Sequence, residues 1–195
     1  MRLFSKLFVI FTFFTLCFSP SRLWAGEPSL QLTATINEFV SILKNTPVAE
    51  LRATGLPPRA LELVLGRFDF SEMTKRSLGR HWGALAPADQ REFVSAFTQK
   101  LLVGYGRTVR TSGDERIQFY NEAIAGNEAK VNTKVVSSGD ELAIDYHLHA
   151  LDGQWKVYDM VIDNVSIVDN YRAQFNRVIA KSSVKELLQK MKQDS

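Results

Sequence analysis

The sequence has 195 residues, 45% of them hydrophobic, with a formal net charge of +3 and one cysteine. Arg2, Lys6 and Arg22 account for that charge, because beyond residue 25 the chain has 21 basic and 21 acidic residues. This balance argues against nucleic acid as a partner, and the lack of any cysteine beyond Cys17 excludes disulfides and thiol chemistry there.

The first 25 residues have the pattern of a cleavable export signal. Arg2 and Lys6 precede the apolar run LFVIFTFFTLCF, which is too short to span a bilayer comfortably, and Ala25 is a small residue suited to a cleavage site. We therefore expect a signal peptide over residues 1–25 and one exported domain over residues 26–195.

The first half of this domain has helical periodicity. Apolar residues recur at helical spacing over residues 32–43, and the segment PPRALELVLGRF has prolines suited to a helix start. Asp69 and Glu72 form a predicted capping box for a helix from about Phe70 to Leu78.

Pro87 opens the longest predicted helix, from about Ala88 to Thr111. Its apolar stripe is formed by Phe93, Val94, Phe97, Leu101, Leu102, Tyr105 and Val109. Such a stripe usually packs against a core. Gly104 and Gly106 flank Tyr105, where they could permit a bend, close packing or room for a ligand.

The second half of the domain predicts four strands in antiparallel hairpins: Arg116–Glu122, Lys130–Ser137, Glu141–Ala150 and Gln154–Asp163. The third strand alternates cleanly, with Leu142, Ile144, Tyr146 and Leu148 on its apolar face. The chain thus places helices first, then a four-stranded antiparallel meander, then two further helices, and this order predicts an α+β fold.

The fourth strand, QWKVYDMVID, is apolar on both faces. Strict alternation places Trp155, Val157 and Val161 on one face and Tyr158, Met160 and Ile162 on the other. A strand with one solvated side should be apolar on one face only, so both faces of this strand are expected to be covered. The helix that follows is predicted to begin near Tyr171, with Tyr171 and Phe175 on its apolar stripe.

Motifs for covalent or nucleotide chemistry are absent from the sequence, including G-x-S-x-G, the Walker loop and the dinucleotide fingerprint. His147 and His149, near Asp145, are favoured as a polar strand face over a metal site, since zinc needs at least three protein ligands. The set Asp159 or Asp163 with Tyr146 is the enzyme alternative, because a carboxyl group in an apolar cavity can act as an acid or base.

Two longer stretches give the most specific pattern in the sequence. The first is FDFSEMTKRSLGRHW followed by APADQREFVSAFTQKLL, and the second, more specific one is WKVYDMVIDNVSIVDNYRAQF. In these stretches, and in order and spacing over nearly the whole domain, the sequence resembles the MlaC family of exported phospholipid-binding proteins. Asn164 stands where the family commonly has glycine, and asparagine tolerates the left-handed conformation expected there.

The resemblance implies a nuclear-transport-factor-two-like sheet wrapped by helices, with a deep apolar pocket for the acyl chains of a phospholipid. It also implies a periplasmic shuttle, monomeric and without a cofactor or catalytic residues. The implied partners are an outer-membrane lipoprotein complex and an inner-membrane ABC transporter complex with an MCE-domain subunit. A related family associated with hopanoids leaves the lipid class open.

With this pocket, one face of the fourth strand would close the core and the other would line the pocket, and alternation alone does not decide which. Tyr171 and Phe175 would face the pocket from the helix that follows. The residues expected to contact lipid follow from strand alternation, helix stripes and the resemblance. They are Phe97, Leu101, Tyr105, Val109, Leu142, Ile144, Tyr146, Leu148, Val157, Met160, Val161, Tyr171 and Phe175. Three functions stay open at this point: a lipid shuttle, a small-molecule enzyme with a similar cavity, and a structural adaptor.

Overall fold

The computed structural model describes residues 27–106, 116–137 and 140–193, with the side chains of residues 52–54, 105 and 106 excepted. The predicted signal peptide, residues 1–25, lies outside these ranges. The helices are α1 (Glu27–Lys44), α2 (Val48–Thr54), α3 (Pro58–Arg67), α4 (Phe70–Leu78), the short 3-10 helix η1 (Gly79–Ala84), α5 (Pro87–Gly106), α6 (Ile167–Lys181) and α7 (Val184–Gln193).

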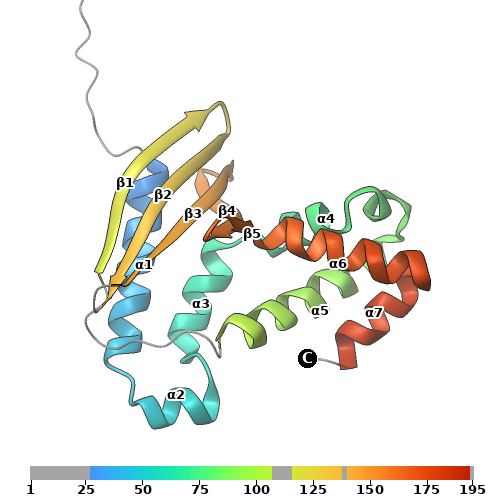
Figure 1. The fold of residues 1–195 in the computed structure, drawn as a ribbon, viewed down its shortest axis with the longest axis horizontal. Coiled ribbons are helices and arrows are strands. Elements are labelled where there is room, and N and C mark those ends of the chain that lie inside the picture. The colour runs from blue at the N-terminus through green and yellow to red at the C-terminus, as the bar shows by residue number, and fades with distance from the viewer. Residues whose placement is uncertain (1–26, 107–115, 138–139, 194–195) are drawn as a thin grey trace, which may run out of the picture.

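The strands form an antiparallel meander in the order β1-β2-β3-β4-β5. They are β1 (Arg116–Ala125), β2 (Glu128–Ser137), β3 (Asp140–Leu151), β4 (Gln154–Ile162) and β5 (Val165–Ser166). Helices α1 and α3 lie against one face of the sheet, called here the inner face, while α4 to α7 lie beyond its β4–β5 edge (Figure 1). The α+β class with an antiparallel sheet is confirmed.

The predicted count of four strands is wrong, because a fifth strand of two residues completes the sheet. Asp163 and Asn164 both have positive φ, 46° and 65°, and turn the chain back tightly enough for β5 to pair with the end of β4. Two successive left-handed residues make the type of turn that suits a hairpin. The conformation expected for Asn164 is confirmed, but so short a return strand has no alternation by which a sequence pattern could predict it.

The two apolar faces of β4 are explained by a β-bulge at Tyr158. Leu148 pairs with Val157 but His147 pairs with Asp159, so Tyr158 is an extra residue in β4. A bulge changes which face the following residues occupy. As a result Trp155, Val157, Met160 and Ile162 all lie opposite inner-face positions of β3, and the strict alternation assumed from the sequence does not hold.

The apolar residues pack into two clusters. One lies between the inner face of the sheet and α1 and includes the fully buried Val131, Leu148 and Val157. The other lies among α4 to α7 and includes Phe93 and Phe97. Several residues contact both clusters, among them Phe68, Met160 and Ile162, so the sheet and the helical part share a continuous apolar interior.

Side-chain caps mark the start of three helices, α4, α6 and α7. The Asp69 carboxylate accepts a hydrogen bond from the Glu72 N–H, as the predicted cap of α4 requires, and the Ser183 hydroxyl accepts one from the Glu186 N–H at the start of α7. Helix α6 begins at Ile167, four residues before the position expected from its apolar stripe. Helix α5 is described to Gly106, and the predicted continuation to Thr111 lies outside the described residues.

The early start of α6 depends on Asp159 of β4. Its carboxylate accepts hydrogen bonds from the Ser166 hydroxyl at 2.6 Å and from the Val168 N–H at 3.0 Å. Ser166 in turn accepts a hydrogen bond from the Asp169 N–H and caps the helix. Asp159 is only 7% exposed, so little water can reach the Ser166 hydroxyl and the Val168 N–H to accept their hydrogen bonds in its place.

We expect Asp159→Ala to lower the free energy of unfolding by about 2 kcal/mol, since it leaves the Ser166 hydroxyl and a helix N–H without their acceptor. Urea unfolding monitored by circular dichroism measures the change. Asp169→Asn, at an exposed position of the same helix turn, is the matched control and should change stability by less than about 0.5 kcal/mol. Equal effects of the two substitutions would contradict the role given to Asp159.

Candidate functional site

A cavity of about 590 Å³ lies between the inner face of the sheet and the helices. Helix α1 provides its longest wall, and the other walls come from α3 to α6 and from all strands but β5. It is lined by Leu32, Thr35, Ile36, Phe39, Val40, Leu43, Leu56, Val64, Arg67, Phe68, Phe70, Met73, Leu101, Leu102, Ile117, Val135, Leu142, Ile144, Tyr146, Met160, Ile162 and Ile167.

The sheet wall follows from strand register. Ile144 and Tyr146 of β3 pair with Ile162 and Met160 of β4, so two neighbouring strands present a continuous apolar surface to the cavity. The bulge at Tyr158 is necessary for this surface, because without it Met160 and Ile162 would lie on the opposite face.

Among the residues that the structure describes, Arg67 is the only charged one in the cavity lining, and it joins three elements. Its guanidinium donates to the Thr35 hydroxyl and the Gln31 side-chain carbonyl of α1, and to the Trp155 main-chain carbonyl of β4, at 2.6–2.9 Å. Burial lowers the pKa of Arg67. All three acceptors are neutral, so Arg67 joins α1, α3 and β4 at the cavity wall without a carboxylate.

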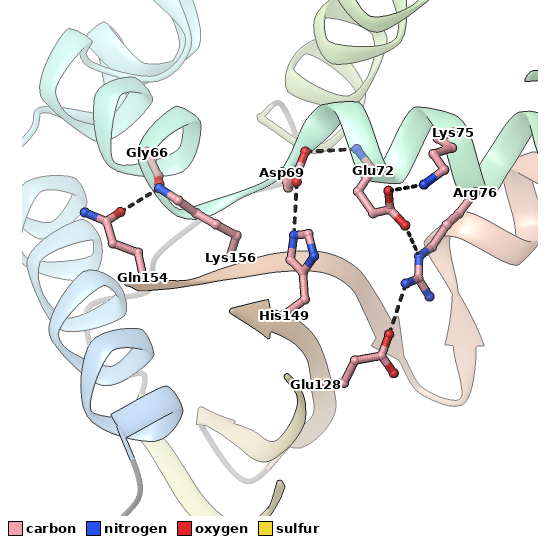
Figure 2. A network of polar contacts seen from close by, with 9 residues as sticks. All are labelled: Gly66, Asp69, Glu72, Lys75, Arg76, Glu128, His149, Gln154 and Lys156. Carbon is pink, nitrogen blue, oxygen red and sulfur yellow. Dashed lines mark hydrogen bonds and ion pairs between the residues drawn. The ribbon is translucent and has the colours of Figure 1, made fainter. Parts of the chain in front are cut away.

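A polar network on the outer side of the sheet fixes the start of α4, which carries the cavity residues Phe70 and Met73 (Figure 2). The Asp69 N–H donates to the Val157 carbonyl, and the Asp69 carboxylate lies 3.0 Å from the Nε2 of His149. Asp69 thereby fixes the α3–α4 connection to β3 and β4.

Further along α4, Arg76 bridges Glu72 of its own helix and Glu128 of β2 (Figure 2). Its guanidinium also lies 3.8 Å from the ring centre of Tyr158, the bulged residue. Burial by itself raises the pKa of Glu72, but the hydrogen bonds and charges of Arg76 and Lys75 hold it below its ordinary value of 4.5. These contacts fix α4 against the sheet.

Five of the residues expected to contact lipid line the cavity together: Leu101, Leu142, Ile144, Tyr146 and Met160. They come from α5, β3 and β4, and their meeting at one cavity is what the sequence interpretation required. Their contact with a lipid stays a prediction.

Six others take different positions. Leu148 and Val157 are buried between sheet and helices, and Val161 lies on the outer face opposite Asp145. Phe97, Tyr171 and Phe175 pack edge-on or tilted against one another among the helices, with ring centres 4.9–5.7 Å apart. Aromatic packing within the helical core therefore holds these three rings away from the cavity lining. Val109 and the side chain of Tyr105 lie outside the described residues.

More of the cavity residues that the sequence interpretation missed come from α1 than from any other element, and Phe39, Val40 and Leu43 are examples. Their helical spacing was recognised, but a stripe does not say whether a core or a cavity lies opposite. The small set of polar groups at the wall, above all Arg67, has no sequence signal of its own.

The groups considered for catalysis or metal binding do not form one site. Some lie on opposite faces of the sheet, and others are paired with neighbouring side chains. Asp159 lies on the opposite face of the sheet from Tyr146 and caps α6. Asp145 pairs with Lys130 at 2.8 Å, and His149 with Asp69. Within the described ranges, no three His, Cys, Asp or Glu residues are grouped as metal ligands would be. Helices with the length and apolar character for crossing a membrane are likewise not found in those ranges.

Together, these features define an α+β protein whose antiparallel sheet and helices surround a large, almost wholly apolar cavity. The chain belongs to the MlaC protein family, whose profile matches residues 33–193. The family resemblance seen in the two sequence stretches is thereby confirmed.

Two individual proteins support this assignment. The Haemophilus influenzae intermembrane phospholipid transport system binding protein MlaC is 22% identical, over 97% of this chain and 93% of that protein. The solved structure of a phospholipid-binding protein from Ralstonia solanacearum, in complex with a phospholipid, has the same fold. It superposes with a TM-score of 0.77 at 23% identity, covering 87% of this chain and 97% of that one.

The lowered pKa of Glu72 makes its contribution to the stability of the fold dependent on pH. A carboxylate with a lowered folded-state pKa stabilises the fold above about pH 4.5, and this contribution is lost as the pH falls through the folded-state value. We expect Glu72→Gln to lower the free energy of unfolding by about 1 kcal/mol at pH 7 and by progressively less below pH 4.5. Urea unfolding across that pH range measures the change. Glu62→Gln, which removes an exposed pair with Arg59, is the control and should have little effect at either pH. A pH-independent cost of Glu72→Gln would contradict the prediction.

Proposed function

We propose that this protein is a periplasmic phospholipid carrier that holds the acyl chains of one lipid in the cavity. The observation that supports the proposal most directly is the apolar lining, in which all described residues except Thr35, Arg67 and Tyr146 have purely hydrocarbon or thioether side chains. The name of the Haemophilus relative and the phospholipid in the Ralstonia structure point to the same cargo.

The size of the cavity suits long hydrocarbon chains. An apolar protein cavity of about 150 Å³ holds one benzene molecule. A cavity of about 590 Å³ therefore has room for on the order of 24 carbon atoms. This exceeds a typical small metabolite and one ordinary acyl chain and accommodates most of the length of two chains, so it favours a lipid as the cargo over a small soluble substrate.

Energetics explain why such a cargo needs a carrier. The two chains of a phospholipid have roughly 30 methylene groups, each stabilised by about 0.8 kcal/mol when removed from water, so exposing them costs on the order of 25 kcal/mol. A cavity that replaces the bilayer interior makes transfer nearly balanced, and no covalent chemistry is required. Differential affinity of membrane partners for the loaded and empty protein then gives the transfer its direction.

The partners in this proposal are an outer-membrane lipoprotein complex and an inner-membrane ABC transporter complex with an MCE-domain subunit. The relative's description as part of an intermembrane transport system supports this arrangement. Export through the signal at residues 1–25 would place the protein between the two membranes, where a monomer could reach either partner.

The decisive measurement is native mass spectrometry of protein purified without detergent, together with chemical identification of extracted lipid. We expect about one phospholipid per chain. A hopanoid in its place would keep the carrier function and change the cargo. The proposal would be overturned if the protein never retains a lipid and takes none up from vesicles. A small-molecule enzyme would then be the favoured function.

The cavity is tested by Leu142→Glu. Leu142 lines the cavity but is 37% exposed, so a carboxylate is tolerated by the fold while it places a charge next to the acyl chains. Burying that charge against lipid costs several kcal/mol, and we expect at least a 100-fold loss of lipid uptake from vesicles.

The matched control is Leu151→Glu on the same strand. Leu151 is 42% exposed and does not line the cavity, so this variant should load lipid as the wild type does. Circular dichroism and thermal melting check that both variants are folded. Normal loading of a folded Leu142→Glu protein would mean that the lipid does not occupy this cavity.

A further inference from the structure

The cavity wall includes one buried hydroxyl group, that of Tyr146. Tyr146 lies on the inner face of β3, between Val131 of β2 and Met160 of β4, and is 7% exposed. Its neighbours along the inner face of β3 are Ile144 and Leu148, neither of which offers a side-chain acceptor. A tyrosine here brings a polar atom to an otherwise apolar surface.

This hydroxyl has no hydrogen-bond partner among the described residues, whereas the other polar groups of the lining are engaged. Thr35 donates to the Gln31 main-chain carbonyl and accepts from Arg67. Among those residues, no side-chain oxygen or nitrogen that is sealed from solvent lacks a partner. The Tyr146 oxygen is therefore not sealed by protein, and since Tyr146 lines the cavity, the open side is the cavity itself.

The protonation state makes the group a donor. Burial raises the pKa of Tyr146 well above its ordinary value of 10.0, so the phenol is neutral at every physiological pH. Once an apolar cargo fills the cavity and excludes water, a donor left without an acceptor costs about 1–3 kcal/mol relative to one that is paired. Phenylalanine would fill the same space without that cost, so the hydroxyl is suited to an acceptor that enters with the cargo.

We propose that the Tyr146 hydroxyl donates a hydrogen bond to an acyl-ester carbonyl oxygen of the bound lipid. The inference rests on the proposed carrier function and adds a polar contact that selects ester-linked chains. A neutral phenol in an apolar wall suits a neutral acceptor, because a phosphate at the same depth would need a cation to balance it. The guanidinium of Arg67, the charged group of the lining, is already directed at three neutral acceptors.

Ether-linked lipid tests this contact, because an ether analogue has the same chains and head group but lacks the carbonyl oxygen. We expect delipidated wild-type protein to bind dipalmitoyl phosphatidylethanolamine about fivefold more tightly than its dihexadecyl ether analogue, the ratio for one net hydrogen bond. The two lipids are offered together in vesicles, and native mass spectrometry measures the loaded ratio. Equal loading of the two would overturn the proposal without any variant.

Tyr146→Phe keeps the ring and removes the donor. In this variant we expect the ester preference to disappear through weaker loading of the ester lipid alone. Tyr120→Phe, at a residue that is 56% exposed and outside the cavity lining, is the matched control and should keep the wild-type preference. If the ester preference persists in Tyr146→Phe, another group must cause it, and the role proposed for Tyr146 is wrong.

The same experiment separates this inference from the function on which it rests. Failure of the wild-type protein to load either lipid would refute the carrier function. Equal loading of both by the wild type and by Tyr146→Phe would leave the carrier function in place and refute the hydrogen bond.

Discussion

The structure depends on a single extra residue in β4. Tyr158 interrupts the alternation of the strand, so the apolar residues before and after it, Val157 and Met160, lie on the same face of the sheet. Without the bulge, Met160 and Ile162 would leave the cavity wall for the outer face. The bulge also places Asp159 on the outer face, where its carboxylate fixes the start of α6. One irregularity thus completes the cavity wall and joins the sheet to the helical part.

The second requirement is that the helices keep the cavity open. In a fully packed interior, side chains from α1 and α5 would fill this space. Here α1 is held at its N-terminal end by the hydrogen bond from the Ser29 N–H to Glu122, and through Gln31 by Arg67. The start of α4 is held by Asp69 on the outer side of the sheet. Because polar contacts at the margin of the cavity and outside it position its walls, the apolar side chains can face open space.

The sequence predicted much of the architecture and less of the site. A cap residue such as Asp69 fixes a helix start locally, and strand alternation in β3 requires no distant partner, so these features were predicted correctly. The division of the β4 residues between the two faces of the sheet was not, because a bulge depends on pairing with β3. Phe97 and Phe175 show the same limit for helices, since an aromatic stripe serves equally well in a packed core or a cavity. The family resemblance predicted that a cavity exists, and only the three-dimensional structure placed residues at its wall.

The margins of the sheet have a consequence for solubility. An open strand edge can pair with that of another molecule and begin aggregation. On one side β5 is only two residues long, and the first half of β4 is covered by the bridge between Phe68 and Val157. On the other side, the register of β1 shifts between Phe119 and Asn121, and such an irregularity disfavours edge-to-edge pairing. A protein that must keep an apolar interior accessible is thereby protected from polymerising through its own backbone.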